Sequence, residues 1–134
     1  MNVRKITEKD WDTLVSWWDW WPGWEAPAKE VLPENGTGGI MVEKNGISVA
    51  ACFIYTTNSK TAWIEWVISN PAYKEKDRGE LIENLLKAAE QVCRNMGNTF
   101  IMSVSRNQPL INKHKKLGWI IQEKPVYEML KFLK

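Results

Sequence analysis

The sequence is poor in the residues from which metal sites and disulfide frameworks are built. Its 134 residues include one histidine, His114, and only two cysteines. Cys52 and Cys93 lie far apart and inside apolar runs, a pattern typical of buried, reduced thiols in a reducing compartment. No set of Cys, His and acidic residues has a metal-ligand spacing, so we expect neither a disulfide nor a metal site.

The sequence also lacks an excess of charge and a long apolar stretch. It has 18 basic and 16 acidic side chains, a formal net charge of +2, and no basic block longer than Lys115–Lys116. Nucleic-acid binding usually needs a basic face, so we expect no such partner. No apolar stretch approaches the roughly 20 residues that span a bilayer, and the polar start Met1–Ile6 does not resemble a signal peptide. We therefore expect a cytoplasmic protein without a membrane partner.

What remains is the composition and periodicity of one globular domain, which we expect to span residues 1–134. Strand-like runs cover residues 3–6, 39–43, 47–57, 61–69 and 99–105. Helical spacing covers residues 7–21, 78–96 and 107–118, with a short helical segment at 26–33. Asn45–Gly46 predicts a tight hairpin, and the runs 119–121 and 126–132 predict a final one.

The strand at 99–105 directly follows the long helix at 78–96. This order predicts a β-helix-β crossover that returns the chain parallel to the strand at 61–69. We therefore expect an α/β (α+β) fold, with a mixed and mostly antiparallel sheet, one parallel strand pair, and helices on both faces.

This order of elements resembles the GNAT acyltransferase superfamily. Val3–Asp10 resembles the family's first strand running into its first helix, and Asn107–Trp119 resembles its "N…LYEKLGF" signature. The resemblance covers essentially the whole chain. It implies a GNAT-like fold with a splayed parallel strand pair, and an N-acetyltransferase that moves an acetyl group from acetyl-CoA to a small-molecule or peptide amine. The amine would attack the thioester directly in a ternary complex.

The loop that would hold the CoA pyrophosphate departs from the family pattern, Arg/Gln-x-x-Gly-x-Gly/Ala. Residues 70–81 contain one glycine, Gly79. The loop still offers a helix N-terminus, that glycine and the basic residues Lys74, Lys76 and Arg78, which suit an anion. Three acids oppose it: Glu75, Asp77 and Glu80. A solvated, mixed-charge helix start is the alternative.

The resemblance assigns the chemistry to two residues and donor binding to three others. Glu65, the one ionisable residue within 62–68, is the candidate base; a glutamate paired with a lysine is the alternative. His114 falls where the family places the tyrosine that protonates the CoA sulfur, on the apolar face of its helix; a structural histidine is the alternative. Main-chain groups near Val67 and Ile68 would pair with the pantetheine arm. Asn107 would cap its helix, contact the cofactor, or do both.

Tryptophan is the residue in excess, with nine in the chain and six of them between Trp11 and Trp24. Trp17 and Trp20 fall off the helical stripe formed by Trp11, Leu14, Trp18 and Trp21, so we expect some indoles to be exposed. GNAT proteins generally bind their acceptor in this part of the chain. The candidate substrate-binding residues are Trp20, Trp21, Trp24 and Trp66.

Exposed indoles suit other uses as well. They stack on planar or cationic groups or form a homodimer contact. The alternative is that the tryptophans simply complete a thin core. A non-catalytic binding module of the same fold, acting through its Trp-rich surface, is therefore the alternative function.

Overall fold

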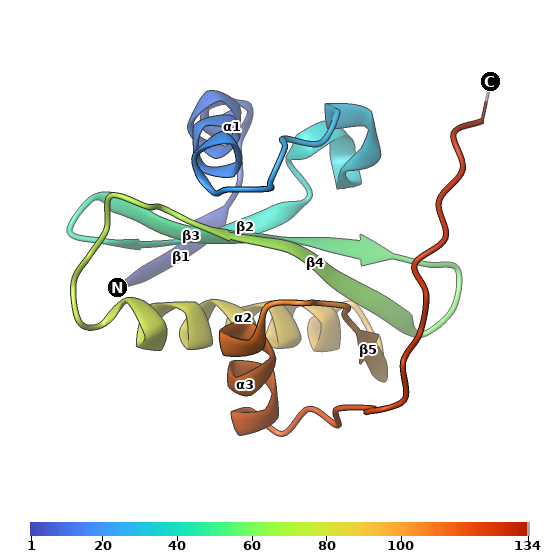
Figure 1. Cartoon of the computed structure of the whole chain (residues 1–134). Coiled ribbons are helices and arrows are strands. Elements are labelled where there is room, and N and C mark those ends of the chain that lie inside the picture. The colour runs from blue at the N-terminus through green and yellow to red at the C-terminus, as the bar shows by residue number, and fades with distance from the viewer. Residues whose placement is uncertain (134) are drawn as a thin grey trace.

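Five strands form one sheet in the order β1-β2-β3-β4-β5 in the computed structural model, which describes residues 1–133 (Figure 1). The strands are β1 (Asn2–Lys5), β2 (Gly39–Lys44), β3 (Ile47–Thr56), β4 (Thr61–Ser69) and β5 (Phe100–Met102). Neighbours are antiparallel except β4 and β5, which are parallel. Helix α1 (Trp11–Trp20) covers one face, and α2 (Arg78–Asn95) and α3 (Gln108–Lys116) lie on the other. The predicted fold class and crossover are confirmed.

Local sequence signals account for most of the element ends. Asn45 and Gly46 have φ values of 52° and 76°, the left-handed pair that a type I′ hairpin turn requires. At the end of α2, the Gly97 N–H donates to the Arg94 carbonyl and the Asn98 N–H to the Cys93 carbonyl, each at 3.0 Å. These two bonds form a Schellman motif and end the helix.

The first helix begins later than predicted, because a 3₁₀ turn over Glu8–Asp10 precedes α1. The Thr7 N–H donates to Asp10 Oδ2 at 2.8 Å, one half of a capping box. Arg4 on β1 donates to both oxygens of the same carboxylate, each at 2.8 Å. This bidentate pair ties the start of α1 to the sheet.

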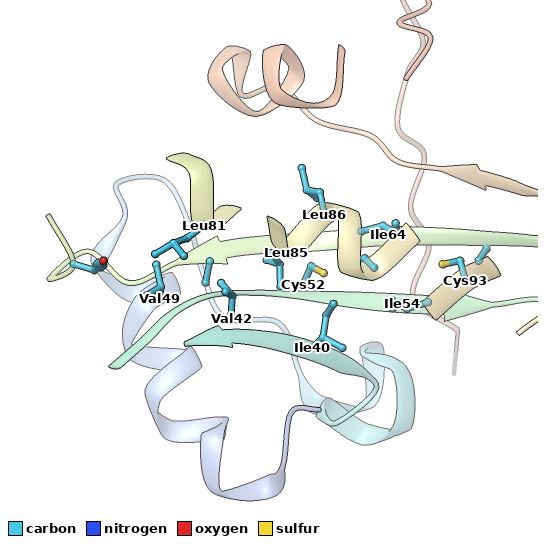
Figure 2. Packing of buried hydrophobic residues seen from close by; sticks show 14 residues of the cluster. Ile40, Val42, Val49, Cys52, Ile54, Ile64, Leu81, Leu85, Leu86 and Cys93 are labelled. Carbon is cyan, nitrogen blue, oxygen red and sulfur yellow. The ribbon is translucent and has the colours of Figure 1, made fainter. Parts of the chain in front are cut away.

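Two hydrophobic clusters pack on opposite faces of the sheet. The α2-face cluster is mostly aliphatic, and Figure 2 shows its packing; its largest fully buried members are Ile64, Leu85 and Leu86. The two cysteines belong to this cluster, with at most 1% of their surface exposed, and burial raises the pKa of both thiols. Inert core thiols were predicted, and their burial is confirmed.

The α1-face cluster is aromatic, with Trp17, Trp18 and Phe53 at its centre. The prediction that Trp17 falls off the buried stripe is wrong, since only 4% of it is exposed. Trp17 lies three residues after the buried Leu14, on the same helical face, so α1 buries a wider arc than the predicted stripe. Trp20 is 58% exposed, as predicted.

The predicted final hairpin is also wrong. No strand or helix forms in residues 119–133, and β5 covers only three of the seven residues predicted for it. The run at 119–121 is short, and Pro125 before the second run has no N–H to donate, so a hairpin here would have few ladder bonds. Among the helices described, none is long and apolar enough to cross a membrane.

Candidate functional site

The two parallel strands separate part of the way along β4. Their pairing runs from Thr61 opposite Phe100 to Trp63 opposite Met102, whereas β4 continues to Ser69. Beyond Trp63, the Glu65 side chain bridges the gap, and its Oε1 accepts from the Val104 N–H at 2.8 Å. The two chains therefore stop pairing after Trp63 and Met102, and we call the unpaired region between β4 and the chain that leaves β5 the fork; Glu65 lies where it begins.

A β-bulge lies just inside the fork. The β3–β4 register passes from Phe53 opposite Glu65 to Ala51 opposite Ile68, so that Trp66 and Val67 together face Cys52. Trp66 has a φ of 56°, a conformation that bulky side chains rarely adopt and that is frequent at functional sites. The sequence gives no sign of this bulge, because no glycine marks it.

The Trp66 side chain is held firmly in this conformation. Its Nε1–H donates to the Tyr55 hydroxyl at 2.8 Å, and its ring packs edge-on against Trp18 at 6.2 Å. The Trp66 side chain therefore packs against the α1-face cluster and fixes the bulge from that face of the sheet.

Glu65 is half-buried on the α1 face, since its cross-strand partner Phe53 belongs to that cluster. Burial raises the pKa of its carboxyl, the Val104 N–H and the Ser103 hydroxyl lower it, and the Glu128 carboxylate raises it further. No salt bridge in residues 1–133 involves Glu65. The expected alternative of a lysine partner is therefore not found in the described chain.

Trp21 and Arg78 both contact Ser69, the last residue of β4; we call this end, far from the β4–β5 pairing, the wide end of the fork. The Trp21 Nε1–H donates to the Ser69 carbonyl at 3.1 Å, and Arg78 Nη2 donates to the Ser69 hydroxyl at 2.5 Å. The guanidinium carbon of Arg78 lies 5.2 Å from the centre of the Trp21 ring. Trp20 packs edge-on against Trp21 at 4.8 Å, and Trp24 is 48% exposed. Arg78 is thus directed toward the end of β4.

The first turn of α2 lies beside the end of β4. Lys113 on α3, which the sequence analysis missed, lies against this turn. A Cβ built on Gly79 would lie 3.7 Å from Cε and 3.8 Å from Nζ of Lys113 on α3. Lys113 forms no salt bridge in the described chain. The basic run at 113–116 was the only signal in the sequence, and it does not say which lysine turns toward α2.

The acid nearest the start of α2 is already partnered. Asp77 accepts from the Tyr73 hydroxyl at 2.6 Å and is paired with Lys44, which lowers the pKa of its carboxyl. Lys74 and Lys76 are exposed and line a surface hollow of about 670 Å³ between the loop at 70–77 and the β2–β3 turn. The structure therefore places the predicted phosphate ligands in two different locations. Gly79 lies next to Lys113, whereas Lys74 and Lys76 line the hollow.

The α3 helix positions Asn107 and His114. Asn107 Oδ1 accepts from the Leu110 N–H at 2.9 Å, so the predicted cap is confirmed. His114 is 4% exposed, facing inward as predicted, and its ring packs edge-on against Trp119 at 4.7 Å. Its Nδ1 lies 2.8 Å from the Leu110 carbonyl, which can only accept, so Nδ1 carries the proton. Nε2 is buried without a hydrogen-bond partner in the described chain.

The structure brings Glu65 and His114 to different sides of the fork. Glu65 lies on the α1 face, whereas α3 packs through Leu110 and Leu117 against the α2-face cluster. No hydrogen bond in residues 1–133 joins the two residues directly. Within the same residues, no group of three or more His, Cys, Asp or Glu is placed to hold a metal ion.

No family model matches the sequence, and no curated protein matches it either. Solved structures of similar fold include the aminoglycoside antibiotic 6'-N-acetyltransferase AAC(6')-IG from Acinetobacter haemolyticus, with 17% identity, a TM-score of 0.64, and coverage of 98% of this chain and 99% of that one. AAC(6')-Iy in complex with the bisubstrate analogue CoA-S-monomethyl-acetylneamine has 15% identity, a TM-score of 0.66 and 98% coverage of both chains.

A third similar structure is the ribosomal-protein-S18-alanine N-acetyltransferase from Escherichia coli. It has 14% identity and a TM-score of 0.67, and the alignment covers 87% of this chain and 76% of that one. At such low identity the likeness concerns the fold. The chain therefore has the fold of the GNAT acetyltransferases, as the order of its elements predicted.

Proposed function

We propose that the protein is an N-acetyltransferase that moves an acetyl group from acetyl-CoA to an amine at the β4–β5 fork. The observation that carries this proposal is the fork itself, which opens beyond Trp63 with a half-buried carboxylate, Glu65, where it begins. A strained bulge borders it, and the start of α2 lies at its wide end. The fold likeness supports the same reaction class.

The fork suits an extended donor with a negatively charged tail. Beyond Trp63, the edge of β4 that faces the fork has no strand partner in the described chain, so the main chain near Val67 and Ile68 is available to the amides of pantetheine. Helix α2 begins beside this region, a helix N-terminus attracts an anion, and Lys113 places a cation next to Gly79. These groups fit a pyrophosphate. Lys74 and Lys76 would attract the phosphates from the neighbouring surface. Asn107, which caps α3, would also contact the cofactor.

In the reaction, the amine nitrogen attacks the thioester carbonyl carbon, and the carbon–sulfur bond breaks. The amine must first lose a proton, and we assign its acceptance to Glu65. Burial raises the pKa of this carboxyl and so makes it a stronger base than an exposed glutamate. The leaving thiolate takes a proton. His114 can supply it only when doubly protonated, because in the neutral ring Nε2 is an acceptor.

The acceptor is, in this proposal, a small-molecule or peptide amine bound over the tryptophans of the wide end. An ammonium group is attracted to an indole face, and the exposed Trp20 and Trp24 flank Trp21. The similar structures include enzymes for an aminoglycoside and for the alanine of ribosomal protein S18. Trp66 would contribute to acceptor binding by shaping the bulge at the fork, and not by stacking on the amine itself.

The proposal is tested by titrating acetyl-CoA and following thermal unfolding. A donor that binds only the folded chain raises the melting temperature in a saturable way. Lys113→Glu should abolish most of that rise, whereas Lys115→Glu, on the exposed side of the same helix, should retain it. Absence of any rise at millimolar acetyl-CoA would contradict the proposal and favour the non-catalytic module.

The catalytic assignment needs a separate measurement, namely release of free CoA with a panel of amines. Glu65→Gln should retain the acetyl-CoA-induced rise but lose about 10²–10⁴-fold in rate, as expected for removal of a general base. His114→Phe should slow turnover with donor binding unchanged. An unaltered rate in both variants would place the proton transfers elsewhere.

A further inference from the structure

One hydroxyl group connects β3 and β4 to the chain that covers the α1 face, and the reaction described above gives it no role. Tyr55 lies near the end of β3, opposite Trp63 on β4. Its hydroxyl accepts from the Trp66 Nε1–H at 2.8 Å and donates to the Val31 carbonyl at 2.9 Å. A phenol has one proton and a carbonyl can only accept, so the proton points to Val31 and a lone pair receives the indole N–H.

The Val31 end of this connection belongs to a turn that lies over the α1 face. The 3₁₀ turn η2 (Lys29–Val31) follows the tryptophan-rich part of the chain, and Leu32 directly after it is 3% exposed within the α1-face cluster. In Figure 1 the short helical turns after α1 lie beside that helix, above the same face of the sheet. The chain that follows the proposed acceptor side is therefore anchored on the sheet, and the carbonyl of Val31 reaches Tyr55.

The Trp66 end belongs to the bulge in β4. One extra residue in a strand reverses the alternation of its main-chain groups beyond that point, so the bulge decides which N–H and C=O groups near Val67 face the fork. The bulge includes the φ of 56° at Trp66, which a bulky residue rarely adopts. Such a conformation persists only where the surrounding structure holds it. The contacts of the Trp66 side chain therefore bear on the main chain of the fork.

The contacts of Trp66 with Trp18 and with Tyr55 differ in kind. The edge-on contact with Trp18 is apolar packing, whereas the hydrogen bond to Tyr55 is directional and fixes the indole at one atom. Burial raises the pKa of the Tyr55 hydroxyl more than the indole bond lowers it, and the Glu65 carboxylate raises it as well. The hydroxyl therefore keeps the proton that it donates to Val31, and it stays a fixed point for the indole close to the proposed base.

We propose that Tyr55 is a positioning residue, whose hydroxyl holds the Trp66 indole and, through it, the bulge that sets the main chain of β4 along the fork. In this role it acts through Trp66 and does not contact the substrate. The inference rests on the proposed function, because the reaction at the fork is what the alignment of β4 serves. Loss of the hydroxyl should misplace the bound thioester, and an error of about 1 Å lowers a rate by up to about 10²-fold.

The test is a double-mutant cycle in the full-length chain, measured by release of free CoA from acetyl-CoA with spermidine, an aminoglycoside and an alanine-initiated peptide as acceptors. Tyr55→Phe removes the hydroxyl and Trp66→Phe removes the N–H, and both keep an aromatic ring. Each should lower kcat about 10–100-fold well below the melting temperature, and should change the KM for acetyl-CoA much less, since the start of α2 is untouched. Because both variants remove the same bond, the double variant should be no slower than either single one.

Thr57→Val is the matched control. Thr57 lies two residues after Tyr55 on the same hairpin, and its hydroxyl also donates to a main-chain carbonyl, that of Thr61, at 2.8 Å. Its loss should lower the melting temperature without changing kcat. In NMR spectra, the Trp66 indole N–H should exchange faster in Tyr55→Phe than in the parent, and should be unchanged in Thr57→Val. Either Tyr55→Phe or Trp66→Phe breaks the bond, so the test holds if one of them does not fold.

The outcomes separate this inference from the proposed function. A parent protein that neither releases CoA nor gains thermal stability from acetyl-CoA would contradict the proposed function and overturn this inference with it. An active parent whose kcat is unchanged by Tyr55→Phe would overturn the inference alone. So would losses that multiply in the double variant, because the hydroxyl would then act through Val31 or on the substrate and not through the Trp66 indole. A loss of kcat shared by Thr57→Val would overturn it too, since the effect would then follow stability.

Discussion

The two faces of the sheet are covered by different kinds of residue, aliphatic on the α2 face and aromatic on the α1 face, and we assign them different roles. The α2 face is covered by aliphatic side chains such as Leu85 and Leu86, which need only to exclude water. The α1 face is covered by aromatic residues, and each indole adds an N–H that requires a partner when buried. Trp66 donates to Tyr55 and Trp21 to Ser69, so packing on this face is also a hydrogen-bond network.

The strained and charged groups follow the same division. Glu65 and the positive φ of Trp66 lie on the aromatic face, next to the fork. Unpartnered buried nitrogens of the described chain, in contrast, occur on both sides of the sheet: Trp18 Nε1 lies on the α1 face, and His114 Nε2 and Trp119 Nε1 lie beside the α2-face cluster. Strain and incomplete hydrogen bonding cost stability and are common at functional sites. We therefore expect the aliphatic cluster of the α2 face to contribute free energy of folding that offsets the strain at Trp66 and the burial of Glu65 on the α1 face.

The largest expected effect comes from the aliphatic face. Leu85 is fully buried between α2 and the sheet, so Leu85→Ala should lower the free energy of unfolding by about 2–5 kcal/mol. Urea denaturation measures this loss. Met96→Ala, at the exposed end of the same helix region, is the control and should change stability by less than about 0.5 kcal/mol. A similar loss in both would mean that this face is not the main source of stability.

The next effect concerns the ion pair that anchors the aromatic helix. Hydrogen bonds from Arg4 lower the pKa of the Asp10 carboxyl, so the pair stabilises the fold above the unfolded pKa near 3.8 and the stabilisation is lost as the pH falls through the folded value. Asp10→Asn should lower the free energy of unfolding at neutral pH by about 1–3 kcal/mol and flatten this acid limb. Urea titrations between pH 2 and 7, roughly the range in which carboxyl groups titrate, would measure both changes.

Glu65 should show the opposite pH dependence. Burial raises its pKa, so the folded chain binds this proton more tightly than the unfolded chain does, and stability falls as the pH rises from about 4.5 through the folded value. Glu65→Gln removes that fall while keeping an oxygen for the Val104 N–H. The variant should gain stability relative to the parent above this window, because it has no charge to bury. A difference between the two proteins that does not vary with pH would contradict the buried carboxylate.

The fold could be predicted from the sequence because its signals are local. Asn45–Gly46, the Gly97 stop and the helix-to-strand order each depend on neighbouring residues, and each is confirmed. The candidate site depends on long-range geometry instead. The bulge at Trp66 arises from the β3–β4 register, and Lys113 reaches Gly79 only because α3 packs beside α2. The final hairpin was predicted wrongly because its runs look like strands whether or not a partner strand is present.

The smallest effect on stability should come from the exposed rim of the aromatic face. Trp20 is 58% exposed and contacts Trp21 through one edge, so Trp20→Ala should change the free energy of unfolding by less than about 0.5 kcal/mol. The buried Trp18, two residues earlier, is the counterpart: Trp18→Ala should lose about 3–5 kcal/mol. If Trp20→Ala weakens amine binding at unchanged stability, the rim serves recognition while the interior of the same face holds the fold. A stability loss equal to that of Trp18→Ala would instead make the whole aromatic helix structural and remove the distinction between rim and core.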